Sequence, residues 1–137
     1  MIKTKINSKD SAQKLGAYSH GYKIDMGDSE IIFTTGQIAL DKDGNVVGLN
    51  DIEAQTEFVF KTLQSILKEA GVSLDDVVKA TIYVTDINDF SKISPIRNKY
   101  FKNSQPVSTL VEVSKLVKEG CKIEVEVIAV KSKVGEG

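Results

Sequence analysis

Residues 50–85 read NDIEAQTEFVFKTLQSILKEAGVSLDDVVKATIYVT, and this stretch decides the fold. Asn50 is placed to cap a helix, and Glu53 three residues later can reach back to the cap. Gly71 can end the same helix in a left-handed conformation. Between them, apolar residues recur at helical spacing: Ile52, Val59, Leu63, Ile66, Leu67 and Ala70. The pattern predicts an amphipathic helix that packs one face against a sheet.

A strand is predicted directly after this helix, over residues 77–85, because its side chains alternate in character. Alternation along a strand sends successive side chains to opposite faces. One face would carry Val78, Ala80, Ile82 and Val84, and the other Lys79, Thr81 and Tyr83.

Outward from this helix–strand pair, turn-rich clusters divide the remaining chain. Strands are expected over residues 18–24 and 30–35, joined by a turn at 26–29. A second helix is expected over 89–101, with a kink or a restart at Pro95 and with Ser94 as a possible cap. Strands over 108–113 and 122–130 close a ββαβαββ order, which is an α+β fold in a single domain of residues 1–137.

Two helices can cover only one face of such a sheet. The last predicted strand presents on its other face Lys122, Glu124, Glu126, Ile128 and Val130. This face is too apolar for free solvent and too charged for a dry core. A subunit interface with polar clefts fits it better than a solvated face does.

Composition excludes several classes of function. Eighteen basic against nineteen acidic residues give a net charge of -1, which supplies no broad attraction to nucleic acid or to an anionic membrane. Cys121 is the only cysteine, so no internal disulfide can form. No segment has the apolar run of a secretory signal or the about 20 apolar residues of a membrane span, so a cytoplasmic protein is expected. No spacing predicts a metal site or a phosphate loop, so no cofactor is expected.

An ordered set of short segments carries a resemblance to a known family. The segments are Gly16, Tyr18-Ser19, Thr35 to Ile38, Ile52 to Gly71, Leu74 to Lys79, Val84 to Asp86, Asp89-Phe90, Tyr100-Phe101, Pro106, Val111 to Val113, Leu116, Ile123 to Glu126 and Ile128 to Val130. Over almost its full length the chain resembles the reactive-intermediate deaminases, the RidA/YjgF or L-PSP-like family. The resemblance implies a chorismate-mutase-like subunit. It also implies a homotrimer with sheets packed at the centre, helices outside and three ligand clefts between subunits.

The resemblance further implies hydrolysis of 2-imino or 2-enamino acids to 2-oxo acids and ammonia. This reaction needs a clamp for the substrate carboxylate and a group that holds water against the imine carbon. By resemblance, Glu124 is the catalytic carboxylate. Substrate-binding positions fall on Tyr18, Gly36, Gln37, Ser94, Ser108 and Thr109.

The family's arginine clamp is missing, because its position two residues after Pro106 holds Ser108. Losing a desolvated, charge-assisted pair would weaken carboxylate recognition by on the order of 2–5 kcal/mol. Ser94 and Leu110 also depart from the family pattern, and Arg97 stands where an aromatic residue is frequent. Arg97 is one candidate replacement for the clamp.

Three hypotheses follow. The first is an imine/enamine deaminase whose activity is weakened or lost through Ser108. The second is a non-catalytic trimer that binds a small carboxylate or imine metabolite. The third, an endoribonuclease or translation inhibitor, is the least expected because the chain has one histidine, His20, and no basic stripe. A structural role is expected for His20 and an inert thiol for Cys121.

Overall fold

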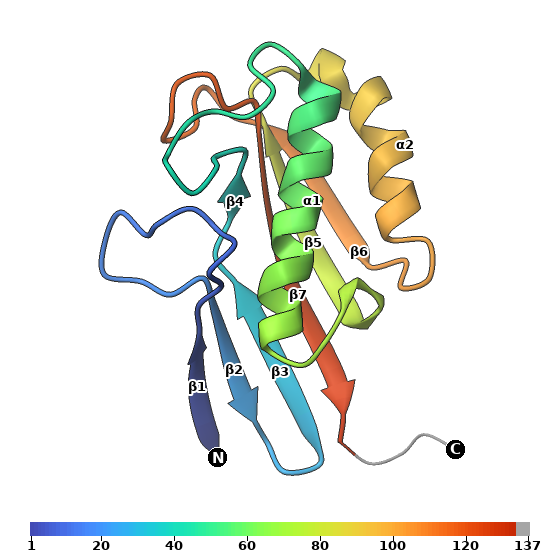
Figure 1. The fold of residues 1–137 in the computed structure, drawn as a ribbon. Coiled ribbons are helices and arrows are strands. Elements are labelled where there is room, and N and C mark those ends of the chain that lie inside the picture. Colours follow the sequence, from blue (N-terminus) through green and yellow to red (C-terminus); the bar gives the residue numbers. More distant parts are fainter. Residues whose placement is uncertain (134–137) are drawn as a thin grey trace.

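The computed structural model describes residues 1–133, and it confirms an α+β fold (Figure 1). The expected elements are present, with two additions, β1 and β4. The strands are β1 (Ile2–Ile6), β2 (Gly21–Asp25), β3 (Ser29–Thr34), β4 (Gln37–Ile38), β5 (Val77–Val84), β6 (Val107–Glu112) and β7 (Ile123–Ser132). The helices are α1 (Ile52–Glu69) and α2 (Phe90–Tyr100), preceded by short 3-10 turns at Leu74–Asp76 before β5 and Ile87–Asp89 before α2.

The strands form one sheet in the order β1-β2-β3-β7-β5-β6, and the short β4 pairs with β7 beyond the end of β3. Only β5 and β6 run parallel, because α2 carries the chain back between them. Both helices lie on the same face of the sheet (Figure 1). The opposite face, called here the open face, has no covering element among residues 1–133.

Helix α1 is capped one residue later than the sequence predicted. Asp51, not Asn50, is the N-cap, and its carboxylate accepts a hydrogen bond from the amide of Ala54 at 3.1 Å. Asn50 lies in the left-handed region at φ 62°, a conformation that asparagine tolerates well, and turns the chain into the helix. The predicted end is confirmed, since Gly71 follows the last turn at φ +81°.

Helix α2 runs without a restart, so the prediction of a new helix start at Ser94 is wrong. Pro95 lies inside the helix on its exposed side, where water can satisfy the carbonyl that loses a backbone donor. Ser94 caps nothing and instead accepts a hydrogen bond from Arg97 at 3.0 Å.

The prediction of which β5 side chains face the core is wrong at the start of the strand. The pairing of β5 with β7 shifts register between Val77 and Lys79, which is a β-bulge at Val78. The bulge turns Val77 into the core and leaves Val78 46% exposed. From Ala80 onward the alternation is as predicted.

Strand β7 separates the core from the open face. Its residues Ile123, Val125, Val127 and Ala129 are buried beneath the helices. Glu124, Glu126, Ile128 and Val130 face the other way, as predicted. Lys122 does not join them, because it precedes the strand and its ammonium group turns toward Asp89 at the start of α2.

Candidate functional site

The carboxylate of Glu124 lies against the backbone of Gly36. Glu124 is on β7 and pairs with Ile38 of β4, so the β3–β4 connection passes directly over its side chain. A Cβ atom added to Gly36 would come within 2.8 Å of Glu124 Cδ and 2.9 Å of its Cγ. Only glycine permits this approach, so the backbone of residue 36 and the carboxylate together line one small site.

Burial raises the pKa of Glu124 above its usual value, and the neighbouring carboxylate of Glu126 raises it further. Glu126 is oriented by Tyr83 on β5, whose hydroxyl donates to its carboxylate at 2.9 Å. The hydrogen bond that Tyr83 donates to Glu126, together with burial, raises the pKa of Tyr83 as well. A raised pKa makes a carboxylate a stronger base, which favours proton transfer from a bound water.

The β3–β4 connection, which carries Gly36, is held by hydrogen bonds from the residues on either side of the glycine. Thr35 donates from its hydroxyl to the carbonyl of Ser19 at 2.6 Å, which ties this connection to the N-terminal loop. Gln37 is buried, and its amide donates back to the Thr35 carbonyl at 3.4 Å. The predicted site residue Gly36 is therefore held beside Glu124. Gln37 pairs with Val125, which is buried beneath the helices, so its side chain is on the helix face and not beside the Glu124 carboxylate.

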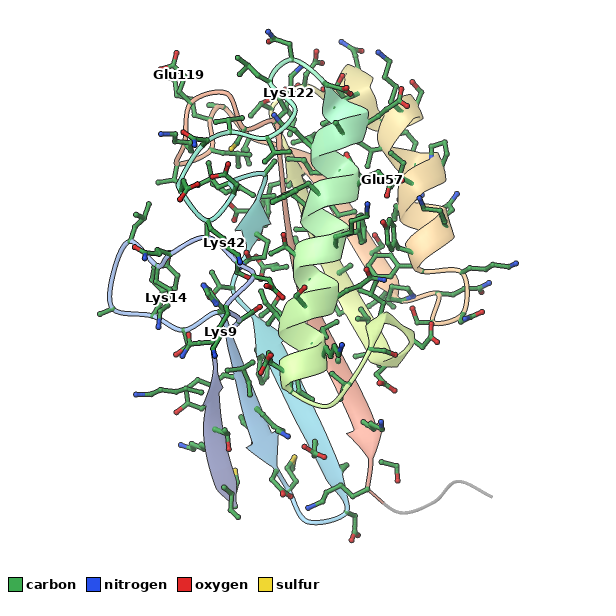
Figure 2. All side chains as sticks on the ribbon, in the orientation of Figure 1. Lys9, Lys14, Lys42, Glu57, Glu119 and Lys122 are labelled. Atoms are coloured by element: carbon green, nitrogen blue, oxygen red, sulfur yellow. The ribbon has the colours of Figure 1, made fainter. Side chains whose placement is uncertain are left out.

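Tyr18 lies in the neighbouring N-terminal loop, the region of Lys9 and Lys14 in Figure 2. It lines a pocket of about 700 Å³ together with Tyr22, Phe33 and Thr35. Its hydroxyl accepts a hydrogen bond from the amide of Leu15 at 3.2 Å, while the side chain stays 45% exposed. Thr35 connects this pocket along the chain to Gly36.

Ser108 lies on the other side of the sheet. It is on the edge strand β6 and pairs with Ala80, which is fully buried beneath the helices, so its side chain is on the helix face. Thr109 pairs with Thr81 and faces the open side. Ser108 opens into a groove of about 540 Å³ between β6 and α2, called here the α2 groove, lined by Arg97, Asn98, Phe101, Lys102, Gln105, Pro106 and Ser108.

The predicted site residues thus form two groups in one chain. Glu124 and Gly36 make a carboxylate group, and Tyr18 lines the neighbouring pocket that includes Thr35. Gln37 is on the helix face and belongs to neither group. Ser108 belongs to the α2 groove, and Ser94 bonds the Arg97 that lines it. Strand β5 separates β7 from β6, and the two groups are on opposite faces of the sheet. A site containing both Glu124 and Ser108 therefore needs two chains.

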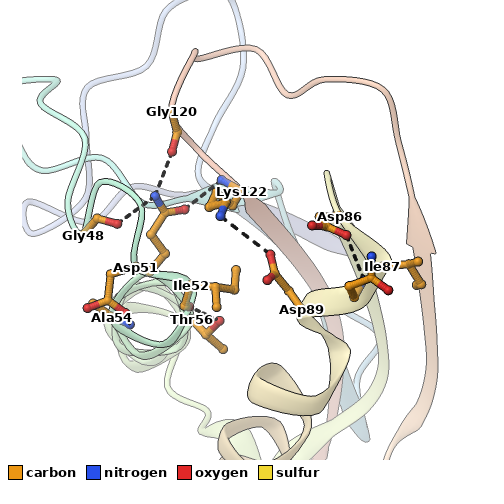
Figure 3. Close-up of polar contacts among 12 residues, drawn as sticks. Gly48, Asp51, Ile52, Ala54, Thr56, Asp86, Ile87, Asp89, Gly120 and Lys122 are labelled. Carbon is orange, nitrogen blue, oxygen red and sulfur yellow. Dashed lines mark hydrogen bonds and ion pairs between the residues drawn. The ribbon is translucent and has the colours of Figure 1, made fainter.

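Sequence reasoning gave no role to Gln55, which holds β7 in position. This fully buried amide donates to the carbonyls of Gly48 at 3.2 Å and Gly120 at 2.8 Å, and accepts from the Lys122 amide at 2.8 Å (Figure 3). The side chain of Lys122 extends to Asp89 at 3.9 Å (Figure 3). Its position among the buried residues of an amphipathic helix is the sequence feature from which a structural role could have been predicted.

His20 and Cys121 have structural surroundings. The Nδ1 atom of His20 accepts from the amide of Ser8 at 3.0 Å, and Nε2 lies 3.0 Å from the carbonyl of Ala12. Burial raises the pKa of the Cys121 thiol, which disfavours the reactive thiolate.

Within residues 1–133, no group of three or more histidine, cysteine or carboxylate side chains is arranged to hold a metal. Neither helix of that region combines the length and apolar character needed to cross a bilayer.

Comparison with known proteins gives consistent likenesses along nearly the whole chain. The family model described as Endoribonuclease L-PSP matches residues 9–131. A RutC family protein of Pyrococcus abyssi is 40% identical over 131 residues, covering 96% of this chain and 99% of that protein. The 2-iminobutanoate/2-iminopropanoate deaminase of Rattus norvegicus is 32% identical over 130 residues, covering 95% and 91%. The crystal structure of Escherichia coli TdcF with bound serine superposes with a TM-score of 0.81 at 30% identity, covering 94% and 99%.

Proposed function

The chain belongs to the L-PSP or RidA/YjgF family, and we propose that it binds small 2-imino and 2-oxo acids in clefts between the subunits of a homotrimer and hydrolyses the imines slowly. The observation that carries the proposal is the contact between Glu124 and Gly36. It supplies a desolvated carboxylate of raised pKa beside a backbone that only glycine allows.

The proposed reaction adds water across the C=N bond and releases ammonia: R–C(=NH)–COO⁻ + H₂O → R–C(=O)–COO⁻ + NH₃. Glu124 accepts a proton from the attacking water as its oxygen bonds to the imine carbon. It returns that proton to the nitrogen, which gives a carbinolamine, C(OH)(NH₂). Glu124 then moves the hydroxyl proton to the nitrogen, so that the C=O bond forms as the C–N bond breaks and ammonia leaves. Tyr83 and Glu126 act through Glu124, since the charge of Glu126 helps to set its pKa.

The rest of the site is proposed to come from a second subunit. The carboxylate group and the α2 groove lie on opposite faces of one sheet, so an assembly is required to bring them together. The edge position of β6 supports this, because Ser108 and Thr109 present both faces of that strand to a neighbour. Tyr18 would then line the cleft beside Glu124.

The test is the rate at which freshly generated 2-iminobutanoate disappears, measured for the parent and for Glu124→Gln. We expect the parent to accelerate the loss. The variant should lose at least about tenfold of that acceleration, because an amide cannot take the proton. Circular dichroism and light scattering should be unchanged in the variant. A variant that unfolds, or one that retains full turnover, would contradict the role of Glu124.

The second candidate, a non-catalytic trimer that binds a small metabolite, is favoured by one observation. Ser108 offers a short, neutral side chain where the deaminases this chain resembles have a guanidinium. Binding of 2-oxobutanoate without any turnover of 2-iminobutanoate would select this function. Ser108→Arg should then strengthen carboxylate binding, since a guanidinium donates two charge-assisted hydrogen bonds that a hydroxyl cannot.

Ribonuclease activity, which the name of the matching family model carries, receives less support. The chain has a net charge of -1 and one histidine, and His20 is buried with both ring nitrogens against backbone groups. RNA binding that weakens steeply with salt would be the evidence for this activity.

A further inference from the structure

We propose that Arg97 binds the ligand carboxylate in the α2 groove, in place of a cation at position 108. The inference rests on the proposed function and names the group that recognises the substrate. The ligand class is a small 2-oxo or 2-imino monocarboxylate.

Charge is the first reason for this assignment. The α2 groove is lined by two cations, Arg97 and Lys102, and by no acidic side chain. None of the ion pairs formed within residues 1–133 involves either of them. Two positive charges beside one groove, without a carboxylate to neutralise them, favour an anionic ligand.

The second reason is that the guanidinium of Arg97 is held in position. Its Nη2 donates to Ser94 Oγ at 3.0 Å, and its Nε donates to Asn98 Oδ1 at 3.2 Å. Its Cζ atom also lies over the ring of Phe90, 5.6 Å from the ring centroid. These contacts use two of its N–H groups and leave others for a ligand, and a preorganised fork loses less entropy on binding a carboxylate.

The third reason is the shape of the groove around Ser108. Serine at this position leaves open the space that Arg97 borders and adds one hydroxyl. Gln105 completes the polar wall and lies at φ 45°, in the left-handed region that non-glycine residues rarely adopt. Such backbone strain is concentrated at binding and active sites. Ser108 and Gln105 can therefore serve the oxo or imino group next to the carboxylate.

The first experiment titrates 2-oxobutanoate into the parent, Arg97→Gln and Lys92→Gln by isothermal titration calorimetry at low ionic strength. Lys92 is the matched control, because it is an exposed cation on the same helix and does not line the groove. Arg97→Gln should bind about tenfold more weakly or worse, and Lys92→Gln should bind as the parent does. Equal thermal midpoints for the two variants will show that α2 remains folded.

The second experiment moves the guanidinium. Ser108→Arg should restore binding in the Arg97→Gln background, and it should add less to the parent, because the two cations would serve the same carboxylate. Equal gains in both backgrounds would overturn the inference, since they would mean that Arg97 does not contact the ligand.

Two further outcomes separate this inference from the proposed function. If the parent binds 2-oxobutanoate and Arg97→Gln binds it equally well, the inference is wrong while the proposed function stands. If the parent neither binds 2-oxobutanoate nor hydrolyses 2-iminobutanoate, both are wrong. Inorganic phosphate is the third arm: displacement of 2-oxobutanoate by equimolar phosphate would overturn the assignment to a monocarboxylate.

Discussion

At the scale of single residues, the glycine at position 36 controls access to the candidate catalytic carboxylate. Its place in the family pattern could be predicted from the sequence, and so could the role proposed for Glu124. The reason for the glycine could not, because the close approach depends on how the β3–β4 connection crosses β7. Steric demands of this kind arise only from tertiary structure.

Gly36→Ala is expected to reduce turnover of 2-iminobutanoate by at least about tenfold, because the new methyl group overlaps the Glu124 carboxylate and forces it away. The thermal midpoint should fall by only a few degrees, since the side chain can move. Comparison with Glu124→Gln provides the control, because both changes should produce the same defect. Full activity in Gly36→Ala would show that the position of the carboxylate is unimportant.

At the scale of elements, strong local patterns were sufficient for α1, β2, β3, β5 and β7. They failed where the determining contact is distant. Strand β1 has little burial of its own and exists because β2 pairs with it along its whole length. The bulge at Val78 is set by the register with β7.

The same limit applies to the candidate site. Proline chemistry predicted a kink or a restart at Pro95, and a restart would have made Ser94 a cap for the second half of α2. Because the helix continues, Ser94 and Arg97 lie one turn apart on the same side and can bond. The hydrogen bond between Ser94 and Arg97 could therefore not be predicted from the sequence, because a proline inside a helix usually kinks or breaks it.

Glu57 joins α1 to α2 and should make their packing sensitive to acid. It accepts hydrogen bonds from Lys99 and, at 2.5 Å, from the Tyr100 hydroxyl. The hydrogen bond from Lys99 is the main cause that lowers the pKa of Glu57, and the hydrogen bond from Tyr100 is the second. Burial and the hydrogen bond to Glu57 raise the pKa of Tyr100 to about 12. A lowered folded-state pKa contributes stability above the unfolded value near 4.5, and that stability is lost as pH falls.

Glu57→Gln is accordingly expected to be less stable than the parent at pH 7, by about 1 kcal/mol, with a difference that shrinks toward pH 3. Urea unfolding at several pH values measures this difference. Glu53→Gln, on the exposed side of the same helix, is the control and should change stability less. A constant difference across the pH range would exclude the ionised carboxylate as its source.

Gln55→Leu should destabilise the protein by about 3 kcal/mol, because it leaves two carbonyls and one amide near the protein interior without partners. Leucine keeps the volume and the apolar surroundings, so the loss isolates the hydrogen bonds. Urea unfolding gives the magnitude. A loss below 0.5 kcal/mol, on the order of a neutral surface change, would mean that water replaces all three bonds.

At the scale of the whole molecule, the open face of the sheet is the largest feature that one chain leaves unexplained. Tyr22, Ile24, Ile31 and Phe33 from the first hairpin share it with Ile128 and Val130 of β7. The two carboxylates of β7 lie on the same face. The sequence already indicated this mixture for the last strand, but the contribution of the first hairpin depends on sheet order.

We expect this face to be covered in a homotrimer, with a mass near three times 15.0 kDa in light scattering at micromolar concentration. Ile128→Lys should shift the mass toward the monomer, because it buries an unpaired charge at the interface. Lys92→Gln, on the exposed side of α2 and so on the other face of the molecule, should not. A parent that scatters as a 15.0 kDa particle would contradict the assembly.

The placement of Glu124 and Arg97 on opposite faces of one sheet predicts genetic complementation between variants at the two positions. If each cleft takes its carboxylate from one subunit and its guanidinium from the next, two different defective alleles should compensate for each other. Glu124→Gln and Arg97→Gln subunits, each impaired alone, would regain turnover after being unfolded together and refolded as mixed trimers. Mixing the same two proteins without subunit exchange should restore nothing. Such complementation would identify the functional unit as the junction between chains.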